Sequence, residues 1–176
     1  MRELPETSFL RQIIPELKLQ SKMPEIQYWF EDFTPGRAFH HVSRKITADE
    51  IVLFAKDFDP QPFHISEEAG KASILGGLAA SGWHTCSIAM RQFFDTILQF
   101  TAGEGSPGVD FVEWRKPVLA GDALGGTITV LESRPLKSRP GLGMVLLRHE
   151  TTNQRGELVM AMEHPFMVRL REGVAA

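Results

Sequence analysis

The chain has 176 residues, of which 43% are hydrophobic and 23% charged, the balance of a folded globular domain. Lys and Arg number 19 against 22 Asp and Glu, so the formal net charge of −3 argues against a nucleic-acid binder. The single cysteine, Cys86, excludes an intrachain disulfide and favours a cytoplasmic location, and no apolar run approaches the roughly 20 residues that cross a bilayer.

The chain is expected to hold one domain over residues 33–172, preceded by an arm and connection over 1–32 and followed by a tail over 173–176. Acidic residues and Pro15 interrupt the short apolar stripe of the arm, which disfavours an import peptide. We therefore expect the arm to pack on the domain or on a second subunit.

The first part of the domain alternates one strand with short helices. A strand is predicted over 37–46, and Thr47 with Glu50 forms a capping box that starts a short helix. Two prolines within 58–63 predict an extended loop there. Ser66, followed by two glutamates, predicts the start of another helix.

The second part begins with the longest helical pattern, over 81–100, which is apolar on most sides and is therefore expected to be buried. A meander of four antiparallel strands is predicted after it, over 109–117, 124–130, 144–152 and 158–170. This order predicts an α+β fold in which one long curved antiparallel sheet wraps a central buried helix. Such a sheet leaves an edge open, so we expect a second copy to pair with it.

One segment carries the residue types of acid–base chemistry. Asp59 and His64 stand close together on a stretch stiffened by Pro60 and Pro62, and a carboxylate beside an imidazole can set its tautomer and charge. The alternative is a solvated aspartate and a histidine bound to the backbone.

Ser81 and Gly82 stand at the predicted start of the buried helix. Amide groups at a helix N-terminus lack intrahelical partners, and a glycine there allows a ligand close to the amide, so a developing oxyanion could be stabilised. The alternative is that Ser81 is only an N-cap and Gly82 only a packing glycine.

Other histidines and the lone cysteine give weaker signals. His40, His41 and His84 lack the close spacing of a metal site, so no metal is expected. His84 and Cys86 fall within the buried-helix pattern and are expected to be core residues rather than a metal ligand and a nucleophile.

The stretch from Phe33 to Leu170 resembles the MaoC-like dehydratases, a hotdog-fold family that includes (R)-specific enoyl-CoA hydratases. The family motif Asp-x-Asn-Pro-x-His is matched at Asp59, Pro62 and His64, with Gln61 in place of the asparagine. Ser81-Gly82 stands where the family commonly has His-Gly, and Trp114-Arg115-Lys116-Pro117-Val118 with Gly121-Asp122 resembles a later strand and turn.

The resemblance implies that Asp59 and His64 form a catalytic dyad that activates water for addition to a trans-2-enoyl thioester. The Gly82 amide would hold the thioester oxygen, with Ser81 and Gln61 also placed at the substrate. No cofactor is implied beyond the coenzyme A of the substrate, whose phosphates could meet the basic residues Arg134, Lys137 and Arg139, or Arg115 and Lys116; a solvated basic loop is the alternative.

Three functions stay open on sequence grounds. The leading one is reversible hydration of an enoyl-CoA to an (R)-3-hydroxyacyl-CoA, by a homodimer or an assembly of dimers that binds neither nucleic acid nor membrane. An acyl-CoA thioesterase and a non-catalytic acyl-thioester binding subunit are the alternatives, because fold alone does not fix function.

Overall fold

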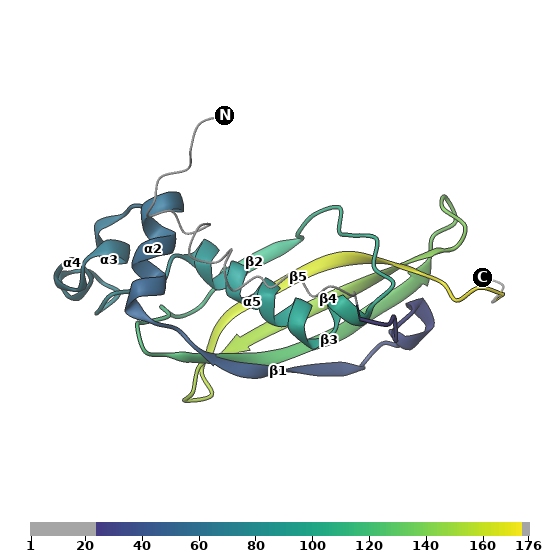
Figure 1. The fold of residues 1–176 in the computed structure, drawn as a ribbon, viewed down its shortest axis with the longest axis horizontal. Helices are drawn as coiled ribbons and strands as arrows, with labels where there is room; N and C mark the ends of the chain where they lie inside the picture. The colour runs from purple at the N-terminus through teal and green to yellow at the C-terminus, as the bar shows by residue number, and fades with distance from the viewer. Residues whose placement is uncertain (1–23, 174–176) are drawn as a thin grey trace. The chain divides into compact units, whose positions relative to one another are not determined.

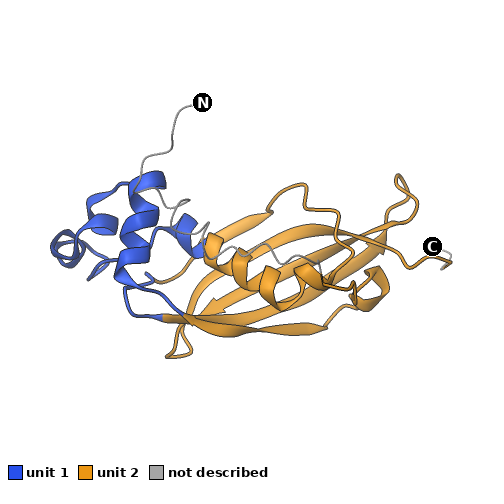
Figure 2. Ribbon diagram, viewed as in Figure 1, with its two compact units in different colours: residues 1–23, 45–86, 117–122 blue, residues 24–44, 87–116, 123–176 orange. Residues whose placement is uncertain are grey.

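The computed structural model describes residues 24–173, and the described residues divide into two compact units (Figure 2). Unit 1 contains residues 45–86 and 117–122, and unit 2 contains residues 24–44, 87–116 and 123 onward. The division falls within the longest helix, α5, which runs over Gly82–Thr96. Most of the expected N-terminal arm lies outside the described residues, so the expected boundaries stay a prediction.

Unit 2 is built on one antiparallel sheet (Figure 1). Its strands lie in the order β1-β3-β4-β5-β2, with the bounds β1 Ala38–Lys45, β2 Phe111–Trp114, β3 Ala123–Pro135, β4 Leu142–Thr152 and β5 Leu158–Arg169. The last three strands form the expected meander. The sequence prediction was wrong for β2, which pairs with β5 at the sheet edge instead of lying beside β3.

The part of α5 in unit 2 packs against the face of the sheet that carries the buried side chains. Alternating positions of β4 are buried, as the pleat of a half-covered strand requires. Phe93 and Ile97 of α5 join a core cluster with buried side chains of Phe33, Ile128, Val130, Val145, Leu147, Phe166 and Val168. The α+β class and the hotdog arrangement of sheet and helix are therefore confirmed.

The core of unit 2 also contains three buried histidines, of which His149 and His164 were not singled out by the sequence patterns. His149 and His164 face each other with 3.0 Å between their Nε2 atoms, and the ring of His41 stacks beside His149 at 6.2 Å. His164 Nδ1 lies 3.2 Å from the carbonyl oxygen of Pro165, so its proton is on Nδ1 and His149 donates from Nε2. Burial, with the charges of His164 and His41, lowers the pKa of His149 to about 3.

Unit 1 holds three short helices, α2 (Ala48–Phe58), α3 (Pro62–Ile65) and α4 (Glu67–Ala72). The capping box is confirmed: Thr47 Oγ1 accepts from the Glu50 amide at 3.2 Å. Ser66 caps α4 as expected. The prediction of a loop through residue 63 was wrong in its second half, because Pro62 occupies the first turn of α3, where a missing N–H costs nothing.

A pair of extended backbone segments completes unit 1. Ala80 donates to the Val118 carbonyl and Ala120 donates to the Leu78 carbonyl, at 2.8 and 2.9 Å. Gly70 of α4 lies so close to Gly77 that a Cβ atom would meet the Gly77 oxygen at 2.2 Å. These contacts fix the backbone around Ala79.

Candidate functional site

Asp59 and His64 face each other within unit 1. Asp59 Oδ2 lies 3.5 Å from His64 Nε2, and the two side chains are 21% and 7% exposed. The sequence prediction that these two residues converge is therefore consistent with the geometry.

The local backbone explains this convergence. Asp59 is the C-cap of α2, and its amide donates to the Ala55 carbonyl at 2.9 Å. The chain turns at once, because the Gln61 amide donates to the Asp59 carbonyl at 2.8 Å. Pro62 then starts α3, which places His64 on a short rigid helix rather than on a loop.

The backbone of Ala79 fixes the ring of His64. His64 Nδ1 lies 2.7 Å from the Ala79 carbonyl oxygen, which can only accept, so Nδ1 carries a proton. In the neutral ring, Nε2 therefore presents a lone pair toward Asp59. No sequence pattern points to Ala79, because a backbone carbonyl leaves no side-chain signature.

Two side chains donate to the Asp59 carboxylate. Ser81 Oγ donates to Oδ2 at 2.7 Å, and Gln61 Nε2 donates to Oδ1 at 2.8 Å. Burial alone would raise the pKa of Asp59, but the hydrogen bonds from Ser81 and Gln61 and the charge of His64 outweigh it and lower the pKa. Asp59 is therefore held as a carboxylate at neutral pH.

Ser81 also connects this carboxylate to the first turn of α5. Its Oγ accepts from the Trp83 amide at 3.2 Å, the geometry of an N-cap, and Gly82 follows as the first helical residue. The predicted substrate contacts of Ser81, Gln61 and Gly82 stay predictions. The hydrogen bonds of Ser81 and Gln61 show that both residues contact Asp59.

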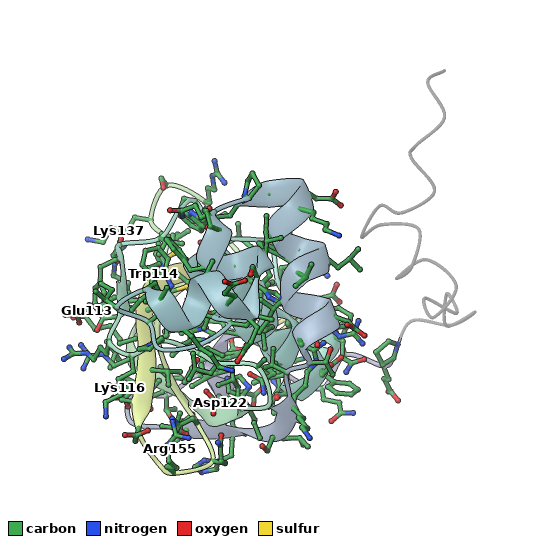
Figure 3. The ribbon with its side chains drawn as sticks, turned by 90° about the vertical axis from the view of Figure 1, so that its left-hand side faces the viewer. Glu113, Trp114, Lys116, Asp122, Lys137 and Arg155 are labelled. Carbon is green, nitrogen blue, oxygen red and sulfur yellow. The ribbon has the colours of Figure 1, made fainter. Side chains whose placement is uncertain are left out.

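The basic residues expected to meet coenzyme A phosphates lie in unit 2. Arg134, Lys137 and Arg139 are exposed, and Lys137 extends away from the ribbon (Figure 3). Arg115 pairs with Glu113 at 2.5 Å, and Lys116 pairs with Glu157 at 2.6 Å. A role for any of these residues at the substrate stays a prediction.

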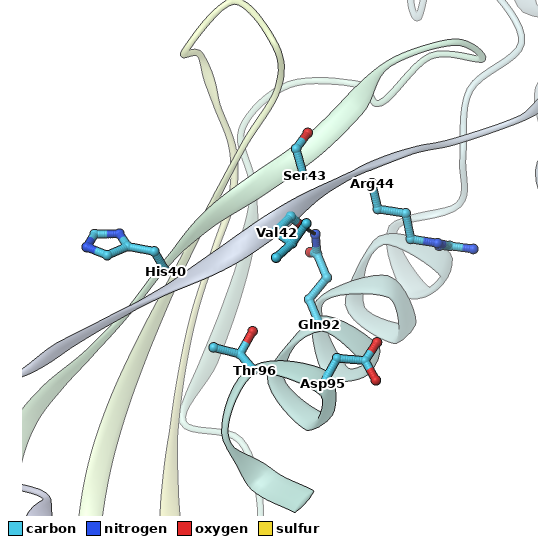
Figure 4. Close-up of a pocket in the computed structure, with 7 residues that line it drawn as sticks. All are labelled: His40, Val42, Ser43, Arg44, Gln92, Asp95 and Thr96. Atoms are coloured by element: carbon cyan, nitrogen blue, oxygen red, sulfur yellow. Dashed lines mark hydrogen bonds between the residues drawn. The ribbon is translucent and has the colours of Figure 1, made fainter.

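A pocket in unit 2 lies between β1 and α5 (Figure 4). Gln92 and Thr96 line it from the helix, and Gln92 Nε2 donates to the Val42 and Leu124 carbonyls at 3.0 and 2.7 Å. None of the residues predicted to act on substrate lines this pocket.

The buried-helix pattern predicted that His84 and Cys86 are core residues. His84 is 2% exposed and stacks on Phe54 at 4.5 Å, so its assignment to the core is confirmed, whereas Cys86 is half-buried. Over residues 24–173, no group of three or more His, Cys, Asp or Glu side chains is arranged to hold a metal ion. None of the helices in this range is both long enough and apolar enough to cross a membrane.

Comparisons with known proteins give one family. The profile of the MaoC like domain matches residues 31–152. A crystal structure of a MaoC-like dehydratase from Rhodospirillum rubrum is 40% identical, with a TM-score of 0.74 over 82% of this chain and 99% of that one. The uncharacterized protein YdeM of Bacillus subtilis is 30% identical over 79% of this chain and 97% of its own length. The (R)-hydratase PhaJ1 of Pseudomonas aeruginosa, at 18% identity over 84% of this chain and 92% of that one, shares the fold with a TM-score of 0.66.

Proposed function

Because the chain belongs to the family of MaoC-like domains, we propose that it is a hydro-lyase that interconverts a trans-2-enoyl-CoA and an (R)-3-hydroxyacyl-CoA. The proposal rests on one observation, the facing pair of Asp59 Oδ2 and His64 Nε2 at 3.5 Å. The relatives support the same class of reaction, since one is named a dehydratase and another an (R)-hydratase.

The pair is suited to hold a water molecule. A carboxylate oxygen and the unprotonated nitrogen of a neutral imidazole are both acceptors, so they cannot hydrogen-bond to each other directly. A water molecule carries two donors and can bind both at once. His64 is fixed by Ala79 and Asp59 is fixed by Ser81 and Gln61, so the geometry is set before substrate arrives.

In the proposed hydration, one proton of this water passes through His64 to C2 of the substrate. The water oxygen attacks C3 of the enoyl thioester while His64 Nε2 accepts one of its protons, with the Asp59 carboxylate stabilising the resulting imidazolium. The electron pair of the C2–C3 double bond moves to C2 and onto the thioester oxygen as an enolate. Return of the proton from His64 to C2 completes the 3-hydroxyacyl product, and dehydration is the reverse.

The enolate oxygen requires a donor, and we assign this to the Gly82 amide at the first turn of α5. Amide groups at a helix N-terminus point out along the helix axis and favour negative charge. A donor aimed at a developing oxyanion contributes about 3 kcal/mol to such reactions.

We further propose that two copies form a homodimer through the β2 end of the sheet. One side of α5 faces β1, because Gln92 donates to the Val42 carbonyl and Thr96 Oγ1 hydrogen-bonds with His41 Nδ1. Met90 and Phe94 project from a different side of the helix, and both are exposed, at 47% and 37%. Two apolar side chains by the edge strand β2 are also exposed: Trp114, the last residue of β2, at 46%, and Val109, just before the strand, at 53%. A second copy that covers these apolar side chains would also pair the open strand edge.

The experiment that tests this function is a screen of trans-2-enoyl-CoA esters of graded acyl length. Loss of the enoyl-thioester absorbance with formation of (R)-3-hydroxyacyl-CoA is expected. Release of free thiol together with the 2-enoic acid, and without any 3-hydroxyacyl-CoA, would indicate a thioesterase instead. Tight binding of every ester without turnover would indicate a non-catalytic subunit. Either result would overturn the proposal.

A further inference from the structure

The hydroxyl of Ser81 is oriented by its two neighbours. Its oxygen accepts a hydrogen bond from the Trp83 amide at 3.2 Å. Its O–H group donates a hydrogen bond at 2.7 Å to the Asp59 carboxylate, which can only accept. Ser81 is 1% exposed, so solvent does not compete for the hydroxyl. The direction of the O–H bond toward Asp59 is therefore determined by the contacts themselves.

The two donors of Asp59 hold different oxygens. Ser81 donates to Oδ2, the oxygen that faces His64, whereas Gln61 donates to Oδ1 from an exposed side chain. A carboxylate held at both oxygens cannot rotate about its terminal bond without breaking a charge-assisted hydrogen bond, the stronger kind in proteins. The buried hydroxyl of Ser81 therefore holds the same oxygen, Oδ2, that faces the imidazole of His64.

We infer that Ser81 is a positioning residue for the proposed hydration, because its hydroxyl holds Asp59 Oδ2 in the orientation that faces His64 Nε2. The inference rests on the proposed function and goes beyond it, since it assigns Ser81 the role of orienting the Asp59 carboxylate and not that of binding substrate. Gln61 assists from the solvent side. Ser81 acts through Asp59 and does not touch the reacting atoms.

Capping alone does not account for this arrangement. The capping hydroxyls of Thr47 and Ser66 accept from the Glu50 and Ala69 amides at 3.2 and 3.3 Å. An N-cap needs only such an acceptor. Ser81 accepts in the same way, but it also donates to a carboxylate on another segment of unit 1.

Loss of this donor has a consequence for pH dependence. The two hydrogen bonds oppose burial and keep the pKa of Asp59 below its ordinary value, and His64 is the titratable group that acts on it. Without Ser81 the pKa of Asp59 rises. The titration of the Asp59 carboxyl itself, followed by 13C NMR, should then move to higher pH.

The test compares Ser81→Ala with Ser73→Ala in the full-length chain. Ser73 is a matched control, because its hydroxyl also lies in unit 1, donates at 2.7 Å and accepts at 3.1 Å, but donates to the neutral Gly70 carbonyl. We expect Ser81→Ala to lower kcat about tenfold with little change in KM and to move the titration of the Asp59 carboxyl to higher pH. Ser73→Ala should lower the thermal midpoint without moving that titration.

A second variant keeps the inference testable if Ser81→Ala does not fold. Gln61→Met retains the length of an exposed side chain but removes its donor, so it should move the Asp59 titration in the same direction by a smaller amount. Wild-type protein without hydration activity would contradict the proposed function. Active wild-type protein in which neither Ser81→Ala nor Gln61→Met moves the Asp59 titration would contradict the inference alone.

Discussion

His64 donates from Nδ1 to the carbonyl oxygen of Ala79 across 2.7 Å, so the backbone, rather than Asp59, orients the imidazole. Ala79 is itself held by its neighbours, since Ala80 donates to Val118 and Ala79 donates to Phe63. Nδ1 of the ring thus holds the imidazole to the backbone, whereas Nε2 faces Asp59. These two roles can be separated by substitution.

His64→Asn should separate them. The Asn side-chain amide can reach the position of Nδ1 and keep the hydrogen bond to Ala79, but it has no group at the position of Nε2. We expect hydration to fall by 10²-fold or more, roughly the contribution of a general base, with a thermal midpoint near that of the wild type. His64→Ala should lose both activity and stability. Steady-state kinetics and thermal unfolding check this, and an active His64→Asn variant would exclude Nε2 as the base.

Gly82→Pro tests the assigned oxyanion donor. Proline is tolerated at the first position of a helix and lacks only the N–H group, so α5 should persist. Hydration is expected to fall by about 10²-fold to 10³-fold. The matched control is Gly82→Ala, which adds a Cβ atom but keeps the amide, and should retain more of the activity. Equal activity of the proline and alanine variants, measured with circular dichroism to confirm the helix, would remove the amide from the mechanism.

Met90→Glu tests the proposed dimer surface. A carboxylate at this exposed apolar position of α5 would be desolvated in the interface, so the variant should elute as a monomer in size-exclusion chromatography with light scattering. Val42→Glu is the control, because Val42 is 84% exposed on β1, the opposite edge strand. A monomeric wild-type protein would show that the proposed interface does not exist. Dissociation by Val42→Glu but not by Met90→Glu would place the interface at β1 instead.

The buried histidines predict loss of stability in acid. The pKa of His149 is lowered from its ordinary 6.5 to about 3, and burial also lowers the pKa of His41 and His164. The unfolded chain therefore binds more protons than the folded chain below pH 6.5. Stability should be full above that pH and should fall by several kcal/mol as the pH drops toward 3.

Denaturant unfolding across this pH range measures the effect. His149→Gln keeps a donor where Nε2 stands, facing His164, but it does not titrate, so the pH dependence should be shallower in this variant. His40→Gln replaces an exposed histidine on the same strand as His41 and should leave the pH dependence as it is. Parallel curves for wild type and His149→Gln would show that His149 does not carry the effect.

Local chemistry made several features predictable. The spacing of Thr47 and Glu50 predicted the start of α2, and the strand patterns predicted β4 and β5 to within two residues. The start of β3 was predicted as well, but the strand continues to Pro135, beyond the predicted end at residue 130. Asp59 and His64 were singled out because a carboxylate and an imidazole stand close together on a segment stiffened by two prolines.

Features that depend on distant contacts were not predictable. The place of β2 at the far edge depends on pairing with β5, and a short strand carries too little pattern to specify its partner. Pro62 suggested a loop, although proline also suits the first turn of a helix. The contact between Ser81 and Asp59 joins residues that periodicity does not connect, and the Ala79 carbonyl has no sequence signature.

The most direct test of the central claim is the hydration of one trans-2-enoyl-CoA that the wild-type protein accepts, measured for wild type and Asp59→Asn, with the configuration of the product determined. The account predicts that wild type forms the (R)-3-hydroxyacyl-CoA and that Asp59→Asn, folded as judged by circular dichroism, is slower by about 10²-fold or more. A folded Asp59→Asn variant with the wild-type rate would contradict it.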